Sequence, residues 1–290
     1  MIAIVQRTAL ALALSGVSAG AAFAGDPSAR DWIPAPVGTN VLAVYMMGLK
    51  SHGFYDQGAR LADSPKLSVQ GMVYRQMHYR ELAGKTVQYE LIVPGLRTTL
   101  DVPGAPRDRL TGIGDVTAGA GVWLHNEPDN RFWFAWRPFI TAPRGRYHGS
   151  QADVSAGKNR WSTVQDFAIV KGFGESSFVE GVAEFEFFGN NKNYYGQTLK
   201  KDTAIRLMAL VSTNLTEKTY VGLRYRYETG GRERVNGQTT VTRARNHQLA
   251  AEITHQLTDA HQVQLQYIHD LKVENGPRMR GLQFRYAYAF

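Results

Sequence analysis

The sequence contains no cysteine, and this absence excludes a disulfide framework as the source of its stability. It also lacks any run of about 18 consecutive apolar residues, so no transmembrane helix is predicted. Acidic residues are the minority of the charged ones, because 25 Asp and Glu stand against 33 Lys and Arg, a net charge of +8. The chain is not disordered in composition, since 43% of its residues are hydrophobic and 11% aromatic. A large hydrogen-bonded fold is therefore expected.

The first 24 residues have the pattern of a secretory signal peptide. Arg7 is the only charged residue among the first 25, and residues 8–17 form an apolar stretch. Ala22-Phe23-Ala24 then supplies a small-x-small cleavage motif. The apolar stretch is shorter than the roughly 20 residues that a spanning helix needs. The sequence thus predicts a cleaved signal peptide at residues 1–24 and a single domain at residues 25–290.

The end of the chain alternates strictly between two kinds of side chain. Leu282, Phe284, Tyr286, Tyr288 and Phe290 are apolar or aromatic, whereas the residues between them are polar or small. Successive side chains of a strand point to opposite faces, so this segment predicts a strand with one hydrophobic face. A chain that ends on such a strand resembles the C-terminal assembly signal of bacterial outer-membrane barrels. The resemblance assigns that role to Tyr286, Tyr288 and Phe290.

Eleven further segments can form strands, and the connections between strands alternate in length. Short polar turns near Gly84, Pro128, Gly174, Thr216 and Asp259 recur about every 42–46 residues, the spacing of one strand–loop–strand–turn unit. Long loops on one side and tight turns on the other are typical of outer-membrane barrels. Unpaired backbone groups are costly in lipid, so the last strand must pair with the first. The prediction is all-β: a transmembrane antiparallel up-and-down β-barrel of about 12 strands. The predicted strands cover residues 41–47, 67–80, 86–93, 113–124, 131–141, 162–170, 177–188, 203–213, 219–227, 243–255, 261–271 and 279–290.

The polar faces of these strands are expected to line the lumen. Neighbouring strands carry opposite charges on this face, which favours cross-strand pairs. Two interpretations stay open: a lattice of salt bridges that fills the barrel, or the polar lining of a transport path. The candidate residues are Asp115, Trp123, Trp133, Arg137, Phe139, Glu180, Glu184, Glu186, Arg206, Arg224, Arg226, Glu252 and Arg285.

Catalysis has little support in the sequence. His148 lies near Ser150 and Asp153, but a triad is defined by geometry and not by adjacency. No G-x-S-x-G, H-E-x-x-H or phosphate-loop motif occurs. We therefore expect no enzyme activity, no cofactor and no metal.

The excess of basic residues could suggest nucleic acid, but export and the scatter of Arg and Lys argue against it. The expected partners are outer-membrane lipid, the phosphates of lipopolysaccharide, the barrel-assembly machinery and small hydrophobic solutes. The barrel is expected to be a monomer in the bacterial outer membrane.

Three motifs resemble a known family. They are Pro36-Val-Gly-Thr-Asn40, Leu110-Thr-Gly-Ile-Gly-Asp115 and Thr141-Ala-Pro-Arg-Gly-Arg-Tyr147. They look like the signatures of outer-membrane transporters associated with meta-pathway phenol degradation, which are distantly similar to long-chain fatty-acid transporters. The usual Pro-Thr-Gly of that family appears here as Pro143-Arg144-Gly145.

The resemblance implies passive uptake of small hydrophobic or aromatic compounds through an outer-membrane channel. Two alternatives stay open. One is a structural or adhesive barrel with a plugged lumen, and the other is a lipid-modifying outer-membrane enzyme.

Overall fold

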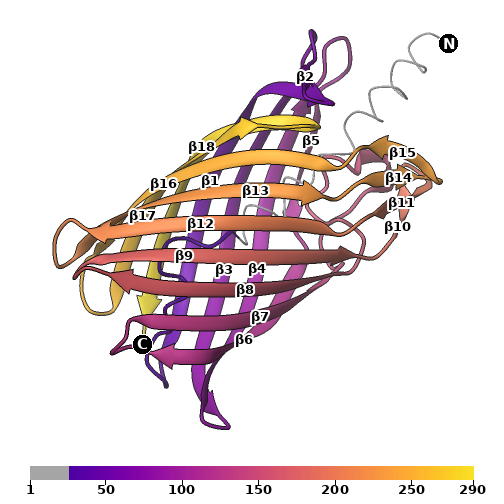
Figure 1. The fold of residues 1–290 in the computed structure, drawn as a ribbon. Helices are drawn as coiled ribbons and strands as arrows, with labels where there is room; N and C mark the ends of the chain where they lie inside the picture. Colours follow the sequence, from indigo (N-terminus) through magenta and orange to yellow (C-terminus); the bar gives the residue numbers. More distant parts are fainter. Residues whose placement is uncertain (1–25) are drawn as a thin grey trace.

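Twelve long antiparallel strands form a closed barrel in the computed structural model, which describes residues 26–290 (Figure 1). The predicted signal peptide lies outside the described residues. The fold class and the strand number predicted from the sequence are confirmed. The barrel strands are β1 (Asn40–Asp56), β3 (Lys66–Leu82), β4 (Lys85–Asp101), β6 (Val116–Glu127), β7 (Phe132–Ala142), β8 (Ser162–Phe173), β9 (Ser177–Phe188), β12 (Ala204–Asn214), β13 (Thr219–Gly230), β16 (Ala244–Gln256), β17 (His261–Lys272) and β18 (Gly276–Ala289).

The barrel closes by pairing of its first and last strands. The register of β1 on β18 runs from Val41 opposite Ala289 to Tyr55 opposite Gly276. Beyond the last pair, the N–H of Asn40 donates to the carbonyl of Phe290 at 2.8 Å, and the N–H of Phe290 donates back to Asn40 at 2.9 Å. The expected pairing of the C-terminal strand with the first strand is therefore present.

The outer surface of the barrel is apolar and the inner surface is polar. Met46, Met72 and Leu282 point outward and are 51%, 59% and 51% exposed. Arg75 and Gln266 point inward and are buried. Closure satisfies the backbone groups and the apolar surface faces lipid, as a membrane-spanning β-barrel requires. Among residues 26–290 no helix has the length and apolar character needed to cross a bilayer.

The connections differ between the two ends of the barrel. One end carries only short turns, at residues 83–84, 128–131, 174–176, 215–218 and 257–260. The other end carries the long connections, apart from residues 273–275 between the last two strands. Asn40 and Phe290 lie at the short-turn end, which is the periplasmic end in barrels of this kind.

Several extracellular elements were not predicted from the sequence. Four short strands from two loops form a separate sheet at the barrel end far from the C-terminus (Figure 1). The first predicted strand was also too short, because β1 continues to Asp56 where a loop had been expected. Backbone pairing continues past the bilayer, where outward side chains are free to be polar. The additional elements are β2 (Ala59–Arg60), β5 (Asp108–Ile113), the 3₁₀ turn η1 (Gly149–Gln151), β10 (Asn191–Tyr194), β11 (Gln197–Lys201), β14 (Glu233–Val235) and β15 (Gln238–Val241).

Candidate functional site

Residues 26–39, named the plug here, lie inside the barrel. Their side chains and backbone contact inward-facing residues of β3, β6, β7, β9, β13, β16, β17 and β18. Only a segment within the lumen can reach strands on all sides of the ring. The sequence did not predict the position of these residues inside the lumen.

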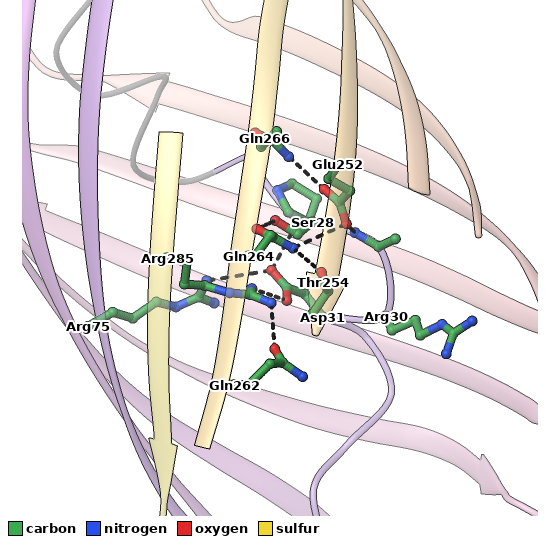
Figure 2. Close-up of polar contacts among 12 residues, drawn as sticks. Ser28, Arg30, Asp31, Arg75, Glu252, Thr254, Gln262, Gln264, Gln266 and Arg285 are labelled. Carbon is green, nitrogen blue, oxygen red and sulfur yellow. Dashed lines mark hydrogen bonds and ion pairs between the residues drawn. The ribbon is translucent and has the colours of Figure 1, made fainter. Parts of the chain in front are cut away.

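Two aspartates of the plug hold it to the wall through ion pairs. Asp26 lies 2.5 Å from Arg226 and 3.0 Å from Arg224. Asp31 lies 2.8 Å from Arg285 and 3.8 Å from Arg75 (Figure 2). These arginine side chains are at most 7% exposed. Removing one partner of a buried pair leaves an uncompensated charge, which typically costs about 3–5 kcal/mol.

Two glutamates of the wall bind the backbone of the plug. The N–H of Ala29 donates to Glu252 at 2.9 Å, and the N–H of Arg30 donates to Glu180 at 2.6 Å. The Ser28 hydroxyl donates to Gln264 at 2.9 Å, and Gln264 and Gln266 in turn donate to Glu252 (Figure 2). The polar lumen thus supplies acceptors for the backbone N–H groups of Ala29 and Arg30.

Trp32 is the apolar anchor of the plug. Its side chain is fully buried, and its carbonyl accepts a hydrogen bond from the indole N–H of Trp123 at 2.9 Å. The guanidinium of Arg137 lies 3.3 Å from the centre of the Trp32 ring, a cation–π contact in a desolvated setting. Trp133 belongs to the same buried cluster.

A cavity of about 120 Å³ lies beside the plug. Its apolar wall consists of Ile92, Pro94, Phe139, Ala156, Val164 and Phe188. The rest of the lining consists of Thr117, Thr141, Ser162 and charged residues in equal numbers of each sign, so the cavity is polar but close to neutral. The six cations are Arg75, Arg137, Lys158, Arg160, Lys201 and Arg206, and the six carboxylates are Asp26, Glu90, Asp115, Asp166, Glu184 and Glu186.

The position of Phe139 depends on a glycine of the neighbouring strand. A Cβ added to Gly119 would lie 2.2 Å from the Phe139 ring and 2.6 Å from the carbonyl of Pro138. Gly119 therefore provides the space in which Phe139 forms one side of the cavity.

The extracellular side of the cavity is covered by the loop of residues 143–161. Asp115 anchors this loop, because its carboxylate accepts the N–H groups of Gly145 at 2.9 Å and Lys158 at 2.7 Å. A second anchor is Asp153, which accepts the hydroxyls of Tyr194 at 2.9 Å and Tyr195 at 3.1 Å. Asp115 thus fixes the loop to the barrel wall, and Asp153 fixes it to the small extracellular sheet.

Burial changes the protonation of two groups in this loop. It raises the pKa of Asp153 to about 7, although the two tyrosine hydrogen bonds act in the opposite direction. It lowers the pKa of Lys158 to about 8. The loop therefore carries a carboxyl group that titrates near neutral pH.

The structure places the candidate lumen residues in two groups. Asp115, Arg137, Phe139, Glu184, Glu186 and Arg206 line the cavity. Trp123, Glu180, Arg224, Arg226, Glu252 and Arg285 contact the plug, as does Arg137.

Cross-strand pairing is only part of this arrangement. Arg206 contacts Glu184 and lies 2.7 Å from Glu186, as alternation on adjacent strands predicts. Arg224, Arg226 and Arg285 instead meet Asp26 and Asp31 of the plug. His148, Ser150 and Asp153 do not form a triad, since the Asp153 carboxylate is held by Tyr194 and Tyr195.

Sequence reasoning missed seven of the twelve charged residues that line the cavity: Asp26 in the plug, Arg75, Glu90 and Asp166 on the barrel strands, and Lys158, Arg160 and Lys201 in the extracellular region. Arg75 and Glu90 form a buried ion pair inside the barrel, and Asp166 lines the cavity. Arg75 lies in a segment whose alternation is poor, so the sequence did not indicate whether its side chain points into the lumen or outward. The only local signal for the plug was the pair Asp26 and Asp31 with Trp32, directly after the cleavage motif.

Solved structures share this architecture. The COG4313 outer membrane channel from Pseudomonas putida F1 superposes with a TM-score of 0.87 and 23% identity, over 91% of this chain and 100% of that one. The transport unit of the autotransporter AIDA-I from Escherichia coli superposes with a TM-score of 0.55 and 9% identity, over 98% of this chain and 97% of that one. The translocator domain of the autotransporter NalP from Neisseria meningitidis superposes with a TM-score of 0.54 and 10% identity, over 89% of this chain and 91% of that one.

Sequence comparison gives a family. A search of curated proteins found no match. The family model described as "Putative MetA-pathway of phenol degradation" matches residues 52–286, which include ten whole barrel strands, most of β18 and the end of β1. This chain belongs to that family.

Proposed function

We propose that the protein is an outer-membrane channel for passive uptake of small hydrophobic or aromatic compounds. The observation that carries this proposal is the cavity beside the plug, with Phe139 and Phe188 in its wall. In another protein, an apolar cavity of about 150 Å³ binds benzene. The cavity here, about 120 Å³, is therefore of the scale of one aromatic ring.

The charged lining of the cavity is compatible with a neutral solute. Arg206 is neutralised by Glu184 and Glu186, and Arg75 by Glu90. Arg137 lies 5.9 Å from the centre of the Phe139 ring and 3.3 Å from that of Trp32. An aromatic solute could contact these cations through its ring face, as Trp32 does.

Passage requires the plug or the covering loop to move. The plug fills the middle of the lumen, and the loop of residues 143–161 covers the cavity. This arrangement excludes large hydrophilic solutes as long as the plug stays docked. The same plug favours the alternative of a structural or adhesive barrel, in which it would never leave the lumen.

The test measures entry of N-phenyl-1-naphthylamine, a hydrophobic aromatic fluorophore, into cells with an intact lipopolysaccharide layer. Cells that express the protein should show faster entry than cells with an empty vector at equal membrane integrity. Phe139→Asp puts a charge into the apolar wall and should return entry to the vector level. As a control, the amount of folded protein at the surface is matched between the variant and the native protein by heat-modifiable gel mobility.

A second arm uses liposome swelling with sugars. Little swelling beyond protein-free liposomes is expected, since the plug blocks a wide aqueous path. Entry of the fluorophore at the vector rate, with normal surface protein, would exclude uptake and leave the structural alternative. Rapid swelling with sugars would show an open hydrophilic pore and would contradict the proposal as well.

A further inference from the structure

The outer wall of the barrel carries a basic groove that is independent of the lumen. It has a volume of about 940 Å³ and extends over the extracellular halves of β18, β1, β3, β4 and β5. Register places its residues side by side: Lys50 lies opposite Arg280, Gln70 opposite Arg97, and Thr99 opposite Arg109. We name this surface the basic groove. Its cations are Lys50, Lys66, Arg97, Arg107, Arg109 and Arg280.

Alternation puts these cations on the lipid side of the wall. Lys50 lies four residues beyond Met46 on β1, and Arg280 two residues before Leu282 on β18, so each shares a face with an exposed apolar residue. Arg109 is related in the same way to Ile113 of β5. The groove therefore begins where the apolar belt of the barrel ends.

The cations of the groove are mostly without acidic partners. The single carboxylate in its lining, Asp101, pairs with Arg107 at 2.9 Å. In the part of the chain that the structure describes, no carboxylate lies within ion-pair distance of Lys50, Lys66, Arg97, Arg109 or Arg280. Five adjacent and exposed positive charges at one level of the membrane need counter-charges.

The floor of the groove can accept a hydrocarbon chain. A Cβ added to Gly48 would meet no atom within 4 Å, so the wall is hollow at this outward position. Leu282 and Tyr267 flank the hollow and are exposed. A ligand that fits both parts has anionic groups at the extracellular boundary and acyl chains that run along the barrel.

We propose that the basic groove binds the phosphorylated, multiply acylated glycolipid headgroup of lipopolysaccharide, the anionic lipid of the outer leaflet. Arg and Lys form charge-assisted hydrogen bonds with phosphate, and Arg can do so with two parallel bonds. A second copy of this chain is disfavoured as the occupant, because a symmetric contact would bring two sets of like charges together. A free phosphate ion would leave the apolar hollow unused.

Binding can be measured with the purified full-length protein in detergent and bisphosphorylated hexa-acyl lipid A as the probe. The variant K50Q/R97Q/R109Q removes three cations of the groove and should weaken binding about a hundredfold, from roughly one decade or slightly less per cation. Monophosphorylated lipid A should bind the native protein more weakly than the bisphosphorylated form. The matched control K192Q/K200Q/R243Q removes three exposed extracellular cations outside the groove and should stay within about twofold of the native affinity.

Three results would overturn the proposal. Equal affinity of the two triple variants would show that the groove is not the site. Displacement of lipid A by inorganic phosphate at equal concentration would indicate a simple anion site. A native dimer that dissociates in K50Q/R97Q/R109Q, without lipid binding, would identify the groove as a contact between copies. Unchanged heat-modifiable mobility of both variants ensures that the comparison is made between folded barrels.

Discussion

The carboxylate of Asp31 lies 2.8 Å from the guanidinium of Arg285 and so joins the plug to the strand that closes the barrel. Arg75 of β3 approaches the same carboxylate at 3.8 Å from the other side of the seam. One plug residue thus neutralises Arg285 and adds a second, longer contact to Arg75, which also pairs with Glu90.

Asp31→Asn should loosen the plug. The change leaves Arg285 without the charge of its partner, whereas Arg75 keeps Glu90, and losses of about 3–5 kcal/mol are typical for a broken buried pair. Single-channel recordings in planar bilayers should show larger or more frequent openings than for the native protein. Asp129→Asn, the same change in an exposed periplasmic turn, should give the same channel recordings as the native protein. Identical conductance of the Asp31 and Asp129 variants would mean that this pair does not hold the plug.

Trp32→Ala should weaken plug docking through lost packing and not through charge. Replacing a fully buried Trp by Ala typically costs about 3–5 kcal/mol. Hydrogen exchange should become faster in residues 26–36, while the barrel strands keep their protection. Trp161→Ala serves as the control because Trp161 is 52% exposed. Uniform loss of protection across barrel and plug would instead indicate that Trp32 stabilises the whole fold.

Gly119→Ala should alter the cavity with little effect on the barrel elsewhere. The new Cβ would meet the Phe139 ring at 2.2 Å, so the ring must move from its present position. Fluorophore entry should fall below the native rate. Gly181→Ala is the matched control, since its Cβ would make an ordinary 3.4 Å contact with Ile169. Native entry rates for the Gly119 variant would remove Phe139 from the solute path.

The covering loop should dock more firmly as pH falls from about 7 to about 4. Burial raises the pKa of Asp153 to about 7, so the docked loop favours the protonated carboxyl. Stability from this group is complete below its ordinary pKa of about 3.9 and is lost as pH rises through 7. Lys158, with a pKa of about 8, stays charged in this range and does not reverse the direction of the pH dependence.

Hydrogen exchange of residues 143–161 would measure this dependence. The opening equilibrium should change by at most about tenfold per pH unit, as one proton requires. Asp153→Asn should abolish most of the change between pH 5 and pH 7. A native-like pH profile in that variant would assign the titration to another group.

Deletion of Phe290 should impair assembly far more than Gln283→Ala. Phe290 exchanges two backbone hydrogen bonds with Asn40 and so completes the closure, whereas Gln283 is a buried lumen side chain in the middle of β18. The amount of heat-modifiable protein in purified outer membranes gives the readout. Equal amounts of both variants would argue that the terminal aromatic residue has no role in assembly.

Alternation was sufficient to predict the barrel wall. Residues such as Val221, Leu223 and Tyr225 alternate with Gly222 and Arg224, and only a half-buried strand in lipid explains many repeats of this pattern. The partner of Arg206 followed from the same logic, because Glu184 lies directly opposite it on the adjacent strand. Local periodicity therefore fixes both the strands and the pairs between neighbours.

The plug could not be predicted in this way. Its contacts join residues far apart in sequence, such as Ser28 with Gln264 and Ala29 with Glu252. Nothing periodic marks residues 26–39, and prolines give the segment the look of a linker. The extracellular sheet was missed for a related reason, since its strands of three to five residues are too short to show alternation.

The plug is covalently tethered to the wall that it contacts. Residues 26–39 continue directly into β1, and at about 3.3–3.6 Å per residue they reach at most about 50 Å from Asn40. A released plug would stay near the lumen at an effective concentration on the order of millimolar. Re-docking is then intramolecular and independent of the amount of protein in the membrane. A single substitution in the plug should accordingly make transient openings more frequent, and only the combined loss of several anchors should leave the barrel open.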